Sequence, residues 1–169
     1  MANNKTPKSK VYESETKVRI MSNYNGVIDW QLTNGRHLIF LKAGSPRTID
    51  FMELENMVWS STLVQEGVIY ISDKEAFEAT GIQNIKWENI KPLPELKKML
   101  SSLEAEDLKE EISKLPEGNK ELLAELAMQD FDNLKGSVVN TIEKESKVNI
   151  SQMKEDEKAN KENQKKSDK

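Results

Sequence analysis

The chain has 169 residues, of which 36% are hydrophobic and 32% are charged, and this length suits about one domain with a modest core. Its 29 acidic and 25 basic side chains give a net charge of −4, so no overall field attracts nucleic acid or anionic lipid. The sequence has no cysteine, which excludes disulfides, thiolate catalysis and cysteine-based metal centres. The N-terminus lacks the apolar core of a secretory signal, and no apolar run approaches the ~20 residues that span a bilayer. We therefore expect synthesis in the cytosol and no membrane partner.

Residues 1–15 contain Asn, Lys, Pro, Ser and Glu and little that a core could bury. Such a composition is typical of a flexible arm. Three lysines make this arm locally basic: Lys5, Lys8 and Lys10. We therefore place the first domain boundary at residue 16.

A strand-rich domain with short helices is predicted over residues 16–91. Alternating or continuous apolar residues indicate strands at 16–21, 27–32, 36–42, 47–49 and 68–71. Asn34-Gly35 suits a tight hairpin between the second and third strands, because both residue types tolerate positive φ. The centre of 36–42 is apolar almost without a break, which predicts a central strand covered on both faces, whereas 47–49 is short and edge-like.

Two short helices are predicted within this domain from two capping boxes, Asp50 with Glu53 and Ser72 with Glu75. The first helix should cover residues 51–60 and cross the sheet, although its apolar residues fit one helical stripe only approximately. The second helix should be one or two turns long.

A helical region is predicted over residues 92–150, after a connecting segment that Trp87 anchors. Apolar residues at helical spacing indicate helices at 94–101, 103–114 and 121–131 and a final segment capped by Ser137. The run Pro116-Glu117-Gly118-Asn119 is interpreted as a break in the chain of helices. The apolar stripes of these helices need partners, and together with the flexible ends they are the evidence for interaction in the sequence.

Residues 151–169 carry interspersed opposite charges and one large apolar side chain, Met153. They cannot bury enough surface to offset the ordering of their backbone, which costs about 1–2 kcal/mol per residue, so a disordered charged tail is predicted. An isolated helix held by Glu–Lys pairs is the alternative. The whole chain is therefore predicted as α+β: a small, mainly antiparallel sheet or partly open barrel, then a short helical region and a disordered tail.

The sequence contains no recognisable catalytic or ligand-binding motif. His37 is the single histidine and begins an apolar strand, and Asp29 or Asp50 could meet it only through folding, so we assign it a structural or surface role. An acidic cluster comprises Glu104, Glu106, Asp107, Glu110 and Glu111. It lacks the glycine turn of a calcium loop and is interpreted as a solvated helix face. We predict no enzyme, no cofactor and no metal site.

Four basic side chains could form a positive strip near three aromatic residues, a combination that sheet-type single-strand binders use. The basic residues are Arg19, Arg36, Lys42 and Arg47, and the aromatic residues are Tyr24, Trp30 and Phe40. A small nucleic-acid-binding or regulatory module is therefore the alternative function. For protein contacts, the candidate surface residues are Arg36, Arg47, Trp87 and Phe131.

Five segments carry a resemblance to a known group of proteins. They are Asn34-Gly35-Arg36, Gly44-Ser45-Pro46, the run from Ile49 to Met57, the run from Gly67 to Asp73 and the run from Leu115 to Ala127. In layout they resemble small virion-associated structural proteins of tailed bacteriophages, in which a strand-rich head precedes helices. The resemblance implies a virion structural or assembly protein, made in the host cytoplasm, that serves as a head, neck or tail component. It also implies contacts with other virion proteins in a multi-copy assembly, and it brings no catalytic residues.

Overall fold

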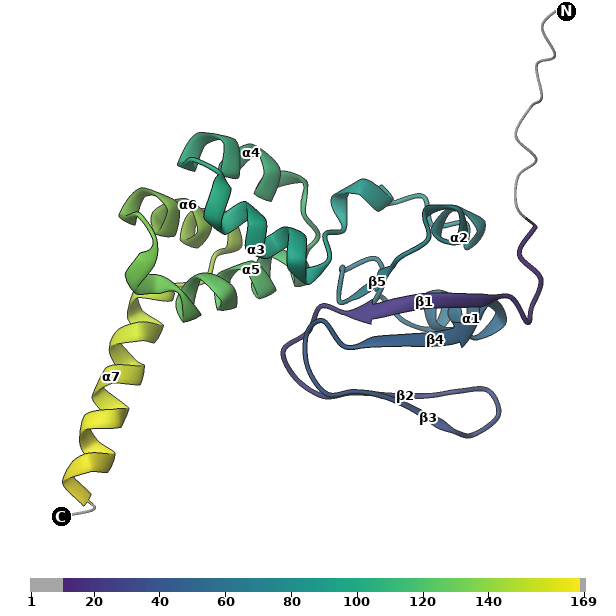
Figure 1. Cartoon of the computed structure of the whole chain (residues 1–169), viewed down its shortest axis with the longest axis horizontal. Coiled ribbons are helices and arrows are strands. Elements are labelled where there is room, and N and C mark those ends of the chain that lie inside the picture. Colours follow the sequence, from purple (N-terminus) through teal and green to yellow (C-terminus); the bar gives the residue numbers. More distant parts are fainter. Residues whose placement is uncertain (1–10, 168–169) are drawn as a thin grey trace, which may run out of the picture.

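The computed structural model describes residues 11–167, and it confirms the α+β class. Two hydrophobic cores define a sheet body and a helical body that lie side by side, and a long helix extends from the helical body (Figure 1). Residues 1–10, where most of the flexible arm was predicted, and residues 168–169 of the predicted tail lie outside the described residues.

The elements follow the chain from the sheet body into the helical body. The sheet body contains β1 (Lys17–Ser22), β2 (Ile28–Gln31), β3 (His37–Phe40), β4 (Pro46–Asp50), α1 (Phe51–Ser60), β5 (Ile69–Ile71), α2 (Lys74–Ala79) and the 3₁₀ turn η1 (Trp87–Asn89). The helical part contains α3 (Leu93–Ser102), α4 (Ala105–Lys114), α5 (Glu117–Gln129), the 3₁₀ turn η2 (Phe131–Asn133), α6 (Gly136–Ser146) and α7 (Ile150–Ser167).

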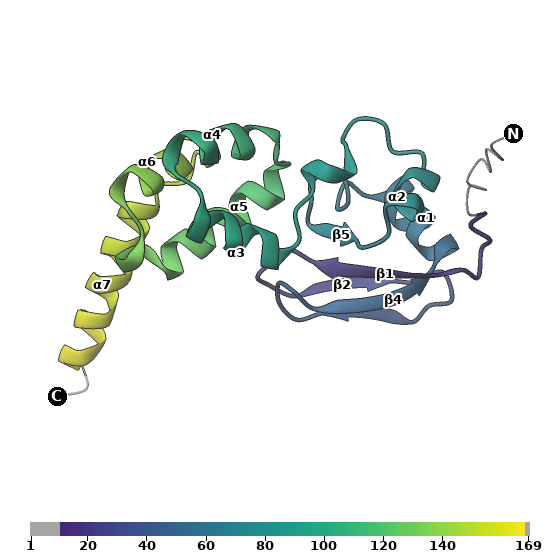
Figure 2. The same ribbon diagram turned by 45° about the horizontal axis from the view of Figure 1, so that its top comes forward.

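Five strands form two small antiparallel sheets in the sheet body. The first has the order β4-β1-β5, and the second is the β2–β3 hairpin. Alternate residues of β1 point into the core, where Val18 and Ile20 meet Leu54 and Met57 of α1. In Figure 2, α1 and α2 lie above β1, β2 and β4, so the helices cover one side of the strands.

The prediction that 36–42 forms a central strand covered on both faces is wrong. β3 pairs only with β2, and its side chains alternate, with Leu38 and Phe40 buried and His37 and Ile39 exposed. An unbroken apolar run indicates burial on both sides only when a second layer covers the strand. Here no described element covers the outer face of β3, so the side chain of Ile39 stays in contact with solvent.

The predicted capping box of α1 is also wrong, although Asp50 does precede the helix. Asp50 pairs with Lys17 at 2.6 Å instead of accepting from the helix amides. Glu53 is 4% exposed and accepts hydrogen bonds from the backbone N–H, at 3.0 and 3.1 Å, and the hydroxyl of Thr33. A buried carboxylate needs such donors, so Glu53 ties α1 to the turn of the β2–β3 hairpin.

Backbone oxygens just before β1 accept hydrogen bonds from the first amides of α1, which neither Asp50 nor Glu53 caps. The amide groups of Phe51 and Met52 donate to the backbone oxygens of Thr16 at 2.8 Å and Ser14 at 3.1 Å. The ring of Tyr12 packs on that of Phe51 with centroids 5.2 Å apart. The predicted flexible arm is therefore too long at its C-terminal end, because residues 12–16 pack on the sheet body.

The second predicted capping box is wrong by one residue. The cap of α2 is Asp73, not Ser72, and its carboxylate accepts from the amides of Glu75 at 3.0 Å and Ala76 at 3.4 Å. The other oxygen of Asp73 accepts from the hydroxyl of Tyr12 at 2.6 Å. One side chain thus starts α2 and holds the residues before β1.

The apolar stripes of the helical part cover one another, which corrects the expectation that they need outside partners. Six large side chains there are fully buried: Leu96, Leu108, Ile112, Leu123, Ile142 and Ile150. They come from α3, α4, α5, α6 and the first turn of α7, so each helix buries its stripe against its neighbours.

Two helix starts differ from the prediction. α5 begins at Glu117, so the segment interpreted as a break is the first turn of a helix. Pro116 precedes this turn, and a proline at this position removes no helix hydrogen bond. α6 begins at Gly136, which places Ser137 inside the helix instead of at its cap.

Residues 150–167 form α7, the helix that the sequence left as the alternative to a disordered tail. Its first turns rest on the helical body through the buried Ile150 and through Lys154, whose ammonium lies 3.5 Å from the backbone oxygen of Met128. Lys154 also pairs with Glu157 at 3.5 Å. Beyond these turns α7 points away from both bodies (Figure 1).

Two buried asparagines join the bodies around the backbone of Lys91. The side chain of Asn119 accepts from the Lys91 N–H at 2.8 Å and donates to its oxygen at 3.0 Å. The amide of Asn23 donates to the same oxygen at 2.9 Å and to Gly67 at 3.0 Å. Both asparagines are almost fully buried, so these hydrogen bonds are shielded from competing water.

Two glycines let the backbones meet at the same place. The N–H of Gly118 donates to the oxygen of Glu66 at 2.8 Å. A Cβ on Gly118 would lie 2.7 Å from that oxygen and 2.8 Å from Val68. Gly67 has φ +74°, and a Cβ there would lie 2.5 Å from Pro116. We call this contact between the 66–67 turn and the start of α5 the joint.

Gly118→Ala tests the joint. We expect it to lower the free energy of unfolding by about 1–3 kcal/mol, because a methyl group must displace backbone atoms. Gly136→Ala is the matched control, since it also lies at a helix start but has open space around its Cα, and its stability should be unchanged or slightly raised. Urea unfolding followed by tryptophan fluorescence measures both variants, and equal effects would contradict the role of the joint.

Candidate protein-interaction surfaces

Large apolar side chains are exposed mainly on the sheet body. They are Val11, Tyr24, Val27, Ile39, Leu41, Met52 and Trp59. From Ser60 to Gln152, all within the described residues, no large apolar side chain is exposed, and Met153 on α7 is the next. The helical body is thus closed, and five of the exposed side chains form two patches on the sheet body.

The hairpin patch consists of Val27, Ile39 and Leu41. In the β2–β3 ladder Asp29 faces Ile39, so the odd-numbered residues of both strands point outward together. Val27 and Leu41 lie one step beyond the ladder on that same side, and the three side chains are 64%, 40% and 65% exposed. An outward cluster of three aliphatic side chains is a candidate contact surface.

His37 lies beside this patch and meets an acid that folding brings to it. Its Nδ1 is 2.6 Å from Oδ1 of Asp29, and both side chains are about half exposed. When the imidazole is protonated this contact is an ion pair. The contact lies on an open strand face, where both side chains reach solvent.

Arg47 braces the hairpin against β4. Its guanidinium donates to the backbone oxygen of Ile39 at 2.6 Å and to that of Pro46 at 2.8 Å, and it lies 5.7 Å from the centre of the Phe40 ring. β3 and β4 share no backbone ladder, so the side chain of Arg47 links the two sheets by its hydrogen bond to β3. Arg47 holds the outer face of the hairpin in place.

Arg36 occupies a different position. Its side chain is exposed at the end of the hairpin, and it lines a polar hollow of about 210 Å³ between β3 and β4 together with His37 and Asp50. Of the aromatic residues predicted beside the basic strip, Phe40 is fully buried and Trp30 packs against the core. Among those three rings, Tyr24 alone offers an exposed face to a nucleic-acid base.

The α1 patch consists of Met52 and Trp59, with Glu55 between them. These residues are spaced i, i+3 and i+7, which places them on one face of the helix. Met52 is 46% exposed and Trp59 is 77% exposed. The opposite face of α1 carries the core residues Leu54 and Val58. Their packing fixes the position of the helix and therefore of the patch.

Trp87 anchors the connecting segment, as the sequence predicted. Its indole N–H donates to the backbone oxygen of Ile71 at 2.8 Å, and its ring packs on Tyr70 with centroids 5.8 Å apart. Burial raises the pKa of Tyr70, and the nearby carboxylate of Glu95 raises it further. Trp87 is half-buried, with its polar atom used inside the protein.

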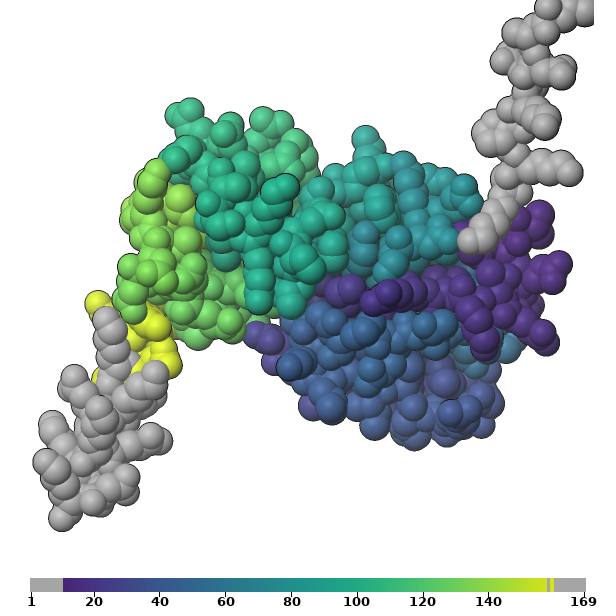
Figure 3. Space-filling model, in the orientation of Figure 1, coloured from purple at the N-terminus to yellow at the C-terminus, as the bar shows by residue number. Residues whose placement is uncertain are grey.

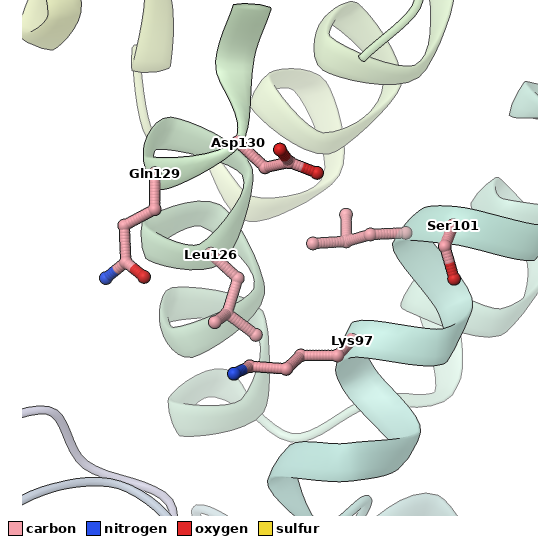
Figure 4. Close-up of a pocket in the computed structure, with 6 residues that line it drawn as sticks. Lys97, Ser101, Leu126, Gln129 and Asp130 are labelled. Carbon is pink, nitrogen blue, oxygen red and sulfur yellow. The ribbon is translucent and has the colours of Figure 1, made fainter. Parts of the chain in front are cut away.

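Phe131 lies in η2 and packs half-buried against the helical core. Near it, α3 and the end of α5 enclose a hollow of about 360 Å³. Lys97 and Ser101 line one wall of this hollow, and Leu126 and Asp130 line the other (Figure 4). Phe131 itself is not one of the residues that line it.

The four predicted contact residues therefore lie in different parts of the fold. Arg36 and Arg47 belong to the sheet body, Trp87 to the connecting segment and Phe131 to the helical body. The prediction missed Leu41 and Trp59, the more exposed members of the two patches. A signal for the α1 patch was present, because the apolar residues of 51–60 fitted one stripe only approximately.

Within the described residues, no three His, Asp or Glu side chains gather in a way that could hold a metal ion. None of the described helices is long and apolar enough to span a membrane. Comparison with protein-family models, curated proteins and solved structures finds no match to this chain.

Arg47→Ala tests the brace. We expect the free energy of unfolding to fall by about 1 kcal/mol, because a charged donor of two backbone hydrogen bonds is lost. Arg36→Ala is the control, since its side chain is exposed, and it should change stability by less than about 0.5 kcal/mol. Urea unfolding compares the variants, and an equal loss in both would rule out the brace.

Tyr70→Phe tests the alkaline behaviour of the connecting segment. A raised pKa means that the folded state favours the neutral phenol, whereas the unfolded phenol ionises near pH 10. Stability should therefore fall as the pH rises from about 10 through the folded pKa. Thermal unfolding should show a smaller fall in Tyr70→Phe than in the parent, while Tyr24→Phe at an exposed position should follow the parent. Parallel curves for all three would contradict the assignment.

Proposed function

We propose that this chain is a structural or assembly protein of a tailed-bacteriophage virion and that it acts through protein–protein contacts. The observation that carries the proposal is the pair of exposed apolar patches on the sheet body. A tryptophan that is 77% exposed on a packed helix is the kind of side chain that dominates the energy of protein interfaces.

The two patches are held ready for contact. Arg47 fixes the backbone of Ile39 in the hairpin patch, and Glu53 fixes α1 to the hairpin turn through Thr33. A surface that is already ordered loses little conformational entropy when a partner binds. Both patches can therefore act as rigid contact surfaces.

The virion part of the proposal rests on the resemblance in layout. The strand-rich body precedes the helical part, as in the phage proteins that the sequence resembles, and the patches lie on that first body. The start of β1 and the far end of α7 lie at opposite ends of the molecule (Figure 1). Such an elongated chain can contact one neighbour through the sheet body and reach another with α7.

Mass spectrometry of purified particles tests the proposal. Phage lacking this protein would be grown in cells that supply the chain in trans, and particles would be isolated on a density gradient. The parent chain should be recovered in several copies per particle. Trp59→Glu should fall at least tenfold in the particle fraction, because a buried charge replaces an interface anchor.

Met153→Glu is the matched control, since Met153 is an exposed apolar residue on α7 outside both patches, and it should enter particles like the parent. A chain found in the lysate and never in particles would contradict the proposal. If that chain also bound DNA with strong salt dependence, the nucleic-acid-binding alternative would be favoured instead.

A further inference from the structure

The α1 patch lies in acidic surroundings. From Thr48 to Asp73 the chain contains five acidic residues and no lysine, arginine or histidine. Two of the five add little to the surface charge, because Glu53 is buried and Asp50 is paired with Lys17. Glu55 is half-exposed between the two apolar residues of the patch. The exposed Glu13 and Glu15 flank Ser14, which is hydrogen-bonded to the first turn of α1. Glu55 thus brings a negative charge into the patch itself, and Glu13 and Glu15 add exposed carboxylates near the first turn of α1.

The hairpin patch has the opposite environment. Lys42 is exposed next to Leu41, and Arg36 is exposed at the far end of the same hairpin. Arg47 reaches the backbone of Ile39 within the patch. Asp29, the acidic residue of the hairpin strands, faces Ile39 in the ladder and contacts His37. This one carboxylate is outnumbered by the cations of Arg36, Lys42 and Arg47 around the patch.

The patches lie on different sides of the sheet body. α1 runs behind β1 and β4 in Figure 1, whereas the hairpin lies below them. In Figure 3 the hairpin region forms the lower surface of the sheet body. Each patch is exposed within one chain, so neither covers the other.

We propose that the α1 patch of one copy docks on the hairpin patch of a second copy, head to tail. Trp59 and Met52 would meet Val27, Ile39 and Leu41, while Glu55 would face Lys42 across the rim. The inference rests on the proposed function and deepens it, because it names another copy of this chain as one partner. Apolar contact with opposite charges at the rim provides affinity and orientation together.

The charges around the patches also disfavour a symmetric contact, in which the same patch of two copies would meet. Two α1 patches facing each other would bring acidic surroundings together, and two hairpin patches would bring basic ones together, which is unfavourable. A head-to-tail contact uses different surfaces on the two copies, so each copy can bind one neighbour on either side. Such contacts produce rings when the rotation closes and filaments when it does not.

Sedimentation velocity on the purified full-length chain tests the inference. Over about a hundredfold range of concentration, the average mass should rise above that of one chain, as reversible association requires. Trp59→Glu and Leu41→Glu should each weaken association at least tenfold. Met153→Glu should behave as the parent does.

Mixing the two weakened variants distinguishes head-to-tail docking from other contacts. Trp59→Glu retains an intact hairpin patch and Leu41→Glu retains an intact α1 patch, so an equimolar mixture should form dimers and stop there. Charge reversal gives an independent measure. Glu55→Lys and Lys42→Glu should each weaken association, and the double variant should recover it, because both signs are then exchanged.

A chain that stays monomeric at every concentration would overturn the inference, and so would a mixture of the two variants that stays monomeric. Neither result touches the proposed function, because recovery of the parent chain in particles is measured separately. A chain that enters particles yet never associates with itself would support the proposed function and exclude this partner.

Discussion

The joint between the 66–67 turn and the first turn of α5 fixes how the two bodies are placed. The oxygen of Glu66 and the N–H of Gly118 can meet at 2.8 Å because Gly118 has no side chain. Asn119, the next residue, then reaches the backbone of Lys91. Three chain segments thus converge through backbone groups and amides, and these contacts join the helical body to the sheet body.

Local patterns were sufficient where neighbouring residues determine the structure. Asn34-Gly35 predicted a hairpin, and the turn uses Gly35 at φ +80° and the side chain of Asn34 as an acceptor for the N–H of Arg36. The helix predicted at 51–60 is α1, with the same bounds. Periodicity and turn chemistry report on residues a few positions apart, and they succeed for that reason.

Distant contacts explain most of what the sequence could not predict. Glu53 looked like a helix cap, yet its partner Thr33 lies twenty positions away and joins it only after folding. Asn119 looked like part of a break, because a buried amide that clamps Lys91 leaves no trace in local pattern. Trp59 was given no role, since apolar content alone does not tell which side of a helix faces the sheet.

The exposed patches change which part of the chain carries the argument for interaction. The helical stripes suggested partners, but they bury one another, and the helical body closes on itself. The sheet body is too small to cover α1 and the hairpin on their outer sides with its own residues. Leu54 and Phe40 are buried in its core, whereas Trp59 and Leu41 remain mostly exposed to solvent. Clustered apolar side chains that do not stabilise the single chain are candidates for contact with a partner.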